Sequence, residues 1–198
     1  MSDFSIELAG HTLEYFDEEH LYLVDGEIVP SITQILKVRF GNKYAGIDKE
    51  VLQRASDAGT AVHEAIENYC KTGDEADLPE LRNFKFLRKQ YNFNPVANEV
   101  PVILFKDGEP IGAGRLDMVI EVGGQIGGAD IKRTSTLDKE YLAYQLNIYR
   151  IAYEQCYGVT WDFLRGIHLK DDIRKFVPIP INESKAWEII NEYKENNQ

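Results

Sequence analysis

The sequence contains few cysteines, and this scarcity excludes two kinds of metal site. Its 198 residues include two cysteines, Cys70 and Cys156, and neither belongs to a CxxC pair. A Cys₄ zinc site and an iron–sulfur cluster each require four cysteines, so we expect neither within this chain. We expect both thiols to be reduced and partly buried, as is usual in a cytosolic protein.

The chain also lacks the segments that direct a protein to a membrane. It contains no run of about 18 apolar residues, which excludes a membrane-spanning helix. The first ten residues, MSDFSIELAG, lack the basic start and the apolar block of a signal peptide. We therefore expect a cytoplasmic protein with no membrane partner.

Basic residues are in the minority, since the formal net charge is −11. Proteins with a large nucleic-acid footprint usually show a basic excess. Carboxylates that bind metal add negative charge, however, and a local basic strip can lie on an acidic body. Arg82, Lys85, Arg88 and Lys89 recur at helical spacing and form either such a strip or an ordinary solvated helix face.

The pattern of apolar residues and turns predicts one domain, residues 1–198, with 43% hydrophobic and 28% charged residues. We expect an α/β fold with a central mixed β-sheet flanked by helices and a small N-terminal β-hairpin region. The predicted strands are Leu13–Phe16, Leu21–Val24, Glu27–Val29, Asn98–Phe105, Ile111–Val122, Gln125–Lys132, Trp161–Leu169 and Phe176–Ile181. The predicted helices are Ile32–Lys37 with Ser31 as N-cap, Lys49–Lys71 stopped by Gly73, Pro79–Tyr91, Asp138–Tyr157 and Glu183–Asn196.

Two aspartates lie among apolar, strand-forming neighbours, where a carboxylate is costly to bury. Asp117 and Asp130 are on either side of the Gly123-Gly124 turn, so they can lie opposite each other on paired strands. Their Cβ atoms would then be about 5.5 Å apart. Two carboxylates this close repel each other unless a cation lies between them, and hard oxygen ligands favour Mg²⁺.

A lysine lies beside the second aspartate. Lys132 is two places beyond Asp130, so the period of a strand puts both side chains on one face. An ammonium group there can orient or activate a water molecule and stabilise charge on a phosphate. Gly114, Gly127 and Gly128 reduce the side chains nearby, and we expect a nucleic-acid backbone to approach closely there.

The order Asp117 … Asp130-Ile131-Lys132 resembles the core of the PD-(D/E)xK nucleases. The flanking residues resemble the RecB-like and phage exonuclease branch of that superfamily, which has a restriction-endonuclease-like fold. Its upstream Gly-x-x-x-His is matched by GTAVH, which ends at His63, and its first-strand Glu by Glu99. Its Gln-x-x-x-Tyr is matched by QLNIY, from Gln145 to Tyr149. The resemblance spans roughly residues 55 to 155.

The resemblance implies a role for each matching residue. Asp117 and Asp130 would be metal ligands, together with the Ile131 carbonyl, and His63 would reach the metal or the scissile phosphate. Glu99 would help to hold metal-bound water, and Lys132 would act on the attacking water. Gln145 would steady the lysine or contact DNA, and Tyr149 and Arg133 are also expected DNA contacts.

Each of these residues taken alone also has an ordinary structural explanation. His63 on an amphipathic helix can be a packed or solvated histidine, and Asp117 can be an ion-pair partner of Arg115 or Arg133. A single Asp-x-Lys triplet arises by chance in many proteins of this size. The joint occurrence of six residues in order, on the expected elements, favours the nuclease interpretation.

The sequence therefore predicts a metal-dependent deoxyribonuclease that uses one or two Mg²⁺ or Mn²⁺ ions. An exonuclease of bacterial or phage recombination is the main hypothesis, with DNA as substrate and a helicase or recombination protein as a candidate partner. A non-catalytic acidic binding or inhibitory module on the same scaffold is the alternative. A sequence-specific restriction endonuclease is a third interpretation, which would need an added recognition segment.

Overall fold

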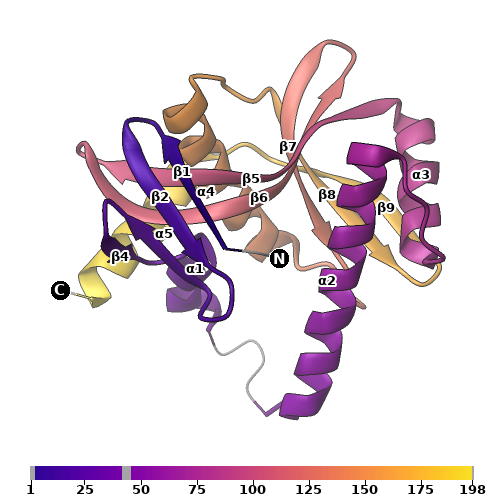
Figure 1. Ribbon diagram of the computed structural model, residues 1–198, viewed down its shortest axis with the longest axis horizontal. Helices are drawn as coiled ribbons and strands as arrows, with labels where there is room; N and C mark the ends of the chain where they lie inside the picture. Colours follow the sequence, from indigo (N-terminus) through magenta and orange to yellow (C-terminus); the bar gives the residue numbers. More distant parts are fainter. Residues whose placement is uncertain (1–2, 42–45, 198) are drawn as a thin grey trace.

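The computed structural model describes residues 3–41 and 46–197, and these residues form two β-sheets and five helices (Figure 1). Sheet A is an antiparallel meander in the order β1-β2-β3-β4. Its strands are β1 (Phe4–Leu8), β2 (His11–Phe16), β3 (Leu21–Val24) and β4 (Glu27–Val29).

Sheet B has the order β5-β6-β7-β8-β9, and its β7–β8 pair is parallel while its other pairs are antiparallel. Its strands are β5 (Phe93–Lys106), β6 (Glu109–Val122), β7 (Gln125–Lys132), β8 (Phe163–Lys170) and β9 (Ile173–Ile179). The parallel pair needs a crossover, and α4 provides it. A mixed sheet flanked by helices, with an N-terminal hairpin sheet, confirms the predicted fold class.

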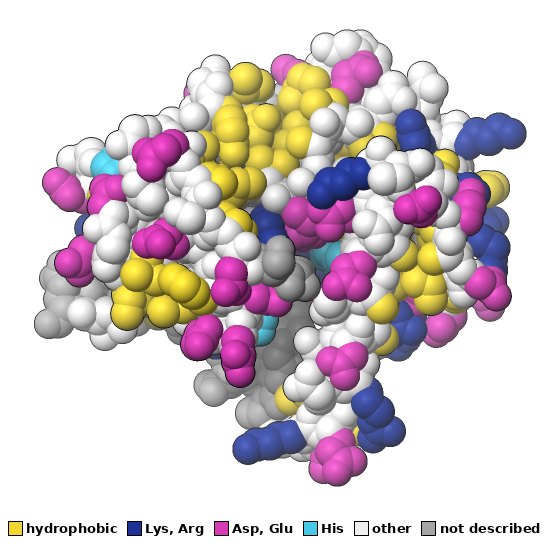
Figure 2. Space-filling model, in the orientation of Figure 1, with side chains coloured by type: hydrophobic (Ala, Val, Ile, Leu, Met, Phe, Trp, Pro, Cys, Tyr) yellow, Lys and Arg dark blue, Asp and Glu magenta, His cyan; other side chains and the backbone are white. Residues whose placement is uncertain are grey.

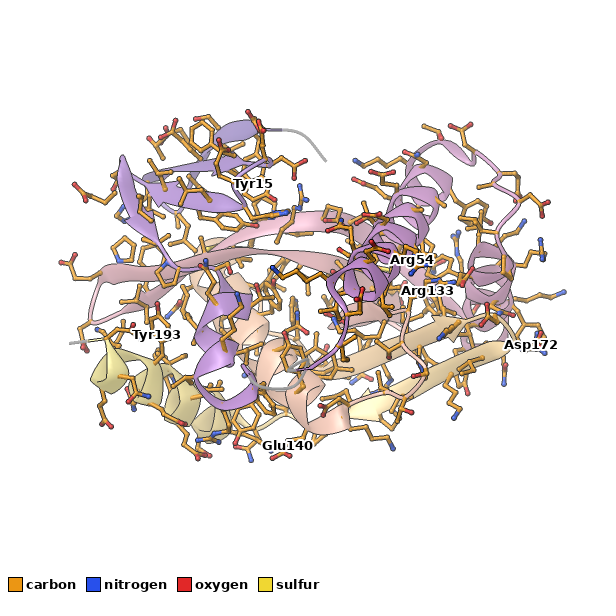
Figure 3. The ribbon with its side chains drawn as sticks, turned by 90° about the horizontal axis from the view of Figure 1, so that it is seen from below. Tyr15, Arg54, Arg133, Glu140, Asp172 and Tyr193 are labelled. Carbon is orange, nitrogen blue, oxygen red and sulfur yellow. The ribbon has the colours of Figure 1, made fainter. Side chains whose placement is uncertain are left out.

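The helices cover both faces of sheet B. They are α1 (Ile32–Phe40), α2 (Lys49–Thr72), α3 (Pro79–Tyr91), α4 (Lys139–Tyr157) and α5 (Glu183–Asn196). One apolar core joins α1, α4 and α5 to the sheet, and a second joins α2 and α3 to it. Sheet A packs on the β5–β6 hairpin through a third, smaller core that includes Ile103 and Ala113. Figure 3 shows sheet A and α2–α3 on one side of sheet B, with α4 and α5 on the other.

Local signals in the sequence set most of the boundaries. Ser31 caps α1 with a full capping box, in which Gln34 contributes the reciprocal hydrogen bond. Gly73 ends α2, as predicted, and it does so in the left-handed conformation that glycine favours. Gly123 and Gly124 both have positive φ, which gives the β6–β7 hairpin its tight turn.

Several elements differ from the prediction. The strand β8 spans Phe163–Lys170 rather than Trp161–Leu169, and β9 spans Ile173–Ile179 rather than Phe176–Ile181. The strand β1 was not predicted, and it pairs with β2 along its whole length. The helix α1 continues to Phe40 rather than ending at Lys37. The strand β5 begins at Phe93 rather than Asn98, because a register shift at Pro95 lets the strand continue through a residue that cannot donate a ladder hydrogen bond.

Among the described residues, no helix combines the length and the apolar character that a membrane span requires.

Candidate functional site

A cleft of about 300 Å³ lies between sheet A and α2, with sheet B as its floor. Sheet A contributes Tyr15, His20 and Tyr22 to its lining, and α2 contributes His63. Sheet B contributes Glu99, Arg115 and Asp117. Figure 2 shows acidic side chains gathered beside a histidine in the hollow near the centre of this face.

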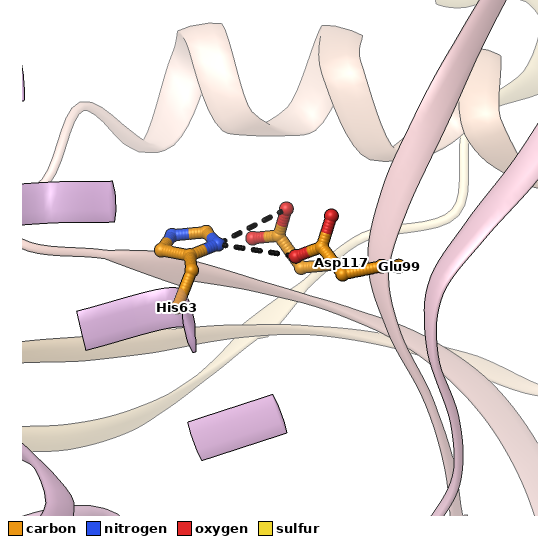
Figure 4. Close-up of side chains that lie close together, drawn as sticks. All are labelled: His63, Glu99 and Asp117. Atoms are coloured by element: carbon orange, nitrogen blue, oxygen red, sulfur yellow. Dashed lines mark ion pairs between the residues drawn. The ribbon is translucent and has the colours of Figure 1, made fainter. Parts of the chain in front are cut away.

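Three side chains in this cleft converge as metal ligands do. One ligand atom from each of His63, Glu99 and Asp117 lies within 4.8 Å of the other two. The Nδ1 atom of His63 is 3.6 Å from Glu99 Oε1 and 3.7 Å from Asp117 Oδ1 (Figure 4). His63 comes from a helix and the two acids from neighbouring strands, so tertiary packing alone brings the three together.

The β5–β6 pairing places Glu99 opposite Asp117. The flanking pairs are Asn98 with Met118 and Val100 with Leu116, so these two acids occupy the position between them. Glu99 has a φ of +51°, a left-handed conformation that is rare for a residue with a side chain. Such a conformation costs about 1–3 kcal/mol and is found preferentially at functional sites.

The imidazole of His63 is held from both sides. Its Nε2 donates a hydrogen bond to the Ile131 carbonyl at 3.2 Å, which leaves Nδ1 facing the two carboxylates. Burial disfavours the imidazolium, but the Asp117 and Glu99 carboxylates outweigh burial and raise the pKa of His63 to about 9. In the protein without metal, a proton therefore occupies the position between His63 and the acids at neutral pH.

Asp117 is oriented by the main chain of β7. Its Oδ2 accepts a hydrogen bond from the Ile131 N–H at 2.6 Å, while Oδ1 faces His63. The β6–β7 ladder includes the pair Met118–Ala129, so the next opposed positions are Asp117 and Asp130, as the hairpin pattern predicts. Ile131 thus contacts two of the predicted site residues through its main chain; its carbonyl as a metal ligand stays a prediction.

Asp130 and Lys132 form an ion pair beside this group. The Lys132 Nζ lies 2.6 Å from Asp130 Oδ2, and the contact lacks the alignment of a hydrogen bond. Asp130 is 1% exposed, and burial together with the Asp117 carboxylate raises its pKa to about 6. Burial disfavours the Lys132 ammonium, but the Asp130 and Asp117 carboxylates outweigh burial and raise its pKa. The predicted shared face of Asp130 and Lys132 is confirmed.

The cluster of candidate ligands includes Glu99, to which the resemblance gave a role with metal-bound water. The ligand group found among the described residues contains Glu99 with His63 and Asp117, and Asp130 is not part of it. Asp130 instead faces Lys132. Its role as a metal ligand stays a prediction.

Arg115 is a further residue of the cleft, and it was not predicted as a site residue. Its Nε lies 2.8 Å from Glu99 Oε2, and both side chains are 13% exposed. Its guanidinium also lies 5.4 Å from the ring centroid of Tyr15, which links sheet A to the cleft. The one available signal was that Arg115 precedes Asp117 by two residues, which places both on one face of β6.

The three predicted DNA contacts have different surroundings. Gln145 is 5% exposed, and its Oε1 has no hydrogen-bond partner among the described residues. Tyr149 lines the cleft, is buried, and donates its hydroxyl hydrogen bond to the Arg115 carbonyl at 3.0 Å. Arg133 donates to Glu80 at 2.8 Å. None of these contacts tests DNA binding, which stays a prediction for all three.

The expectation that the glycines leave open space near the site is wrong for Gly127 and Gly128. A Cβ atom on Gly128 would lie 2.1 Å from the Trp161 ring, and one on Gly127 would lie 2.4 Å from the Phe163 ring. A Cβ on Gly114 would lie 3.1 Å from Tyr149. Gly127 and Gly128 therefore make room for the protein's own aromatic side chains. Gly114 lines the cleft beside Tyr149, and the close approach of a nucleic-acid backbone there stays a prediction.

Comparison with known proteins supports the fold. No protein-family model matches the chain, and no curated protein matches it by sequence. Among solved structures, the crystal structure of SSO0001 is similar, with a TM-score of 0.50 and 15% sequence identity. The match covers 86% of this chain and 77% of that one. At this identity, the likeness shows that the two chains share an α/β fold with a mixed sheet.

Proposed function

We propose that this protein is a metal-dependent deoxyribonuclease, an exonuclease that hydrolyses phosphodiester bonds. The observation that carries the proposal is the convergence of His63, Glu99 and Asp117 in one cleft, next to the Asp130–Lys132 ion pair. Two of these acids and the lysine follow the Asp … Asp-x-Lys order that the sequence shares with PD-(D/E)xK nucleases.

The donor set fits a divalent cation. Carboxylate oxygens suit Mg²⁺ and Mn²⁺, and the imidazole nitrogen shifts the preference toward Mn²⁺. His63 donates its other ring N–H to a main-chain carbonyl, as metal-binding histidines usually do. The rare backbone conformation of Glu99 is consistent with a carboxylate held in place for a ligand. His63, Glu99 and Asp117 would hold the ion, with Asp130 as the further ligand that the sequence predicts.

The other groups have roles that follow from their charges. Lys132 keeps its proton because Asp130 and Asp117 raise its pKa, so it can orient water and stabilise charge on the phosphate, rather than accept a proton. Arg115 is held by Glu99 at the same cleft and can bind a phosphate oxygen. A bound Mg²⁺ or Mn²⁺ ion would supply Lewis acidity and lower the pKa of its own water.

The proposal is tested first by cleavage. The purified protein is incubated with end-labelled linear DNA and with closed circular DNA, in Mn²⁺, Mg²⁺ or EDTA. We expect linear DNA to be shortened from its ends in the presence of metal, and circular DNA to resist. Asp117→Asn is expected to abolish cleavage. The matched control is Asp107→Asn, the same change in the β5–β6 turn, where Asp107 already has a positive φ that asparagine tolerates.

A second measurement reports on the metal without cleavage. Titration calorimetry with Mn²⁺ near pH 7, repeated in two buffers with different ionisation enthalpies, should show release of about one proton as His63 becomes neutral. Asp117→Asn should abolish this binding and Asp107→Asn should preserve it. Absence of both Mn²⁺ binding and cleavage would contradict the proposal and favour a non-catalytic acidic module, for which the net charge of −11 is the supporting observation.

A further inference from the structure

A second groove lies along α3, outside the candidate metal site. Its volume is about 590 Å³, and its lining includes Arg82, Lys85, Phe86, Arg88 and Lys89 from α3 and Tyr69 from α2. We call it the α3 groove. Figure 2 shows Lys and Arg side chains gathered along the right-hand side of the molecule, where Figure 1 places α3.

The charge of the α3 groove is opposite to that of the whole protein. Four cationic side chains line it, and none of the described residues in its lining carries a carboxylate, although the net charge of the chain is −11. Arg82 and Lys85 contact Asp77 and Glu75, at 2.7 and 2.5 Å, in exposed pairs that contribute little and that a phosphate can replace.

Arg88 and Lys89 are the better anchors for an anion. Within residues 3–41 and 46–197, neither has a carboxylate within ion-pairing distance. Lys89 is exposed and Arg88 is partly exposed on the last turn of α3. In this position both cations stabilise α3 by interacting with the negative, C-terminal end of its dipole. This interaction needs no carboxylate partner, so an anion from solvent can still bind to both side chains.

Aromatic faces lie between these cations. The Lys85 Nζ is 5.3 Å from the centroid of the Tyr69 ring, and Phe86 is 45% exposed. The guanidinium of Arg174, on β9, lies 3.9 Å from the Phe86 centroid and adds a further cation. The half-buried Tyr69 ring and the exposed Phe86 ring thus lie among cations, an arrangement typical of surfaces that bind a nucleic-acid strand, because bases stack on such rings. An acidic peptide would satisfy the charges and leave the rings unused.

Two elements connect the α3 groove with the metal site. Tyr69 follows His63 on α2, which corresponds to a rise of about 9 Å along the helix. Asn94, also in the groove lining, precedes Glu99 on β5 by about 17 Å along the strand. At about 3.4 Å per nucleotide of a strand, the groove is roughly three to five nucleotides from the site.

We propose that the α3 groove binds the phosphate backbone of the DNA substrate a few nucleotides away from the bond that is cleaved. This inference rests on the proposed nuclease function and adds a site for holding the substrate. A net charge of −11 is compatible with this site, because four cationic side chains are concentrated at one groove.

The test is DNA binding by the Arg88→Gln/Lys89→Gln variant, measured by fluorescence anisotropy with a labelled single strand of DNA. EDTA is present, so neither cleavage nor a bound metal contributes. The matched control is Lys37→Gln/Lys194→Gln, which makes the same charge change on α1 and α5, across sheet B from α3.

We expect the groove variant to bind about 20-fold more weakly than wild type at about 0.1 M salt. Its plot of log K against log[salt] should be shallower by about 1.4, the value for two lost phosphate contacts. The control should keep the wild-type affinity and slope. Hydrolysis of bis(p-nitrophenyl) phosphate, which is too small to reach the groove, should be unchanged in the groove variant.

Wild-type affinity and slope in the groove variant, or an equal loss in the control, would overturn the inference while leaving the nuclease proposal intact. Loss of binding to a polyglutamate peptide with unchanged DNA binding would also overturn it, in favour of an acidic protein partner. A wild-type protein that neither binds Mn²⁺ nor cleaves DNA would instead refute the proposed function, and the inference would fall with it.

Discussion

Removing the Lys132 ammonium is expected to destabilise the fold and also to remove a group that we propose takes part in cleavage. Asp130 is 1% exposed, and Lys132 Nζ lies 2.6 Å from its Oδ2. In Lys132→Met the Asp130 carboxylate would be buried without its cation. The variant therefore perturbs a structural ion pair and a proposed catalytic group at the same time, and the two effects have to be separated.

The expected size of the effect follows from this geometry. At 2.6 Å and an effective dielectric constant of about 20, the attraction between two unit charges is on the order of 6 kcal/mol. Desolvation offsets part of it, and removing one partner of a buried pair typically costs about 3–5 kcal/mol. Replacing both partners by neutral groups of similar size costs much less, because no charge is then left buried alone.

The assay is urea unfolding of four metal-free proteins at pH 7.5: wild type, Lys132→Met, Asp130→Asn and the double variant. We expect Lys132→Met to lower the free energy of unfolding by about 3–5 kcal/mol, and the double variant to recover at least half of that loss. A loss below about 1 kcal/mol in Lys132→Met, or a double variant less stable than Lys132→Met, would refute the reasoning. Cleavage by Lys132→Met is then measured well below its unfolding temperature, so that lost activity reports on chemistry.

Two further predictions concern stability. His63 has a folded-state pKa of about 9, above its ordinary value of 6.5, so its contribution is fully present below pH 6.5 and is lost as the pH rises through about 9. The metal-free protein should therefore lose about 3 kcal/mol of unfolding free energy between pH 6 and pH 9.5 by urea titration, and His63→Gln should flatten this dependence. A profile that His63→Gln leaves unchanged would count against the ion pairs at His63. Gly128→Ala should lower the free energy of unfolding by about 3 kcal/mol, because its Cβ would lie 2.1 Å from the buried Trp161 ring. The control is Gly59→Ala within α2, where a Cβ meets open space, and it should be neutral or stabilising by up to about 1 kcal/mol. Equal stability of the two variants in thermal unfolding would contradict the role of Gly128 in making room for Trp161.

Local patterns in the sequence were enough to predict the hairpin that carries Asp117, Asp130 and Lys132. The Gly123-Gly124 turn sets the register of β6 and β7, and the period of a strand places Asp130 and Lys132 on one face. The helix caps at Ser31 and Gly73 were also predictable, because each cap depends on residues within about one helical turn. Periodicity also predicted the mixed sheet, since α4 separates β7 from a parallel partner.

The site residues that lie far from the hairpin in the sequence were predicted from the order of motifs in the chain. The distances between these residues could not be predicted in that way. His63 and Glu99 matched expected positions, but the sequence did not indicate that Glu99 would stand closer to the imidazole than Asp130 does. The left-handed conformation of Glu99 and its ion pair with Arg115 were equally hidden. Both depend on how β5 lies against β6, because Glu99 and Arg115 come from these two strands.

The sequence by itself determined the elements, the hairpin register and the candidate acids and lysine, because these depend on periods and turns that act over a few residues. Only the tertiary structure decided which groups meet: the imidazole against two carboxylates, the aromatic rings against Gly127 and Gly128, and the cations along α3 beside Tyr69. The physical reason is that packing between distant segments depends on shape and volume across the whole core, and no local pattern in the chain records either.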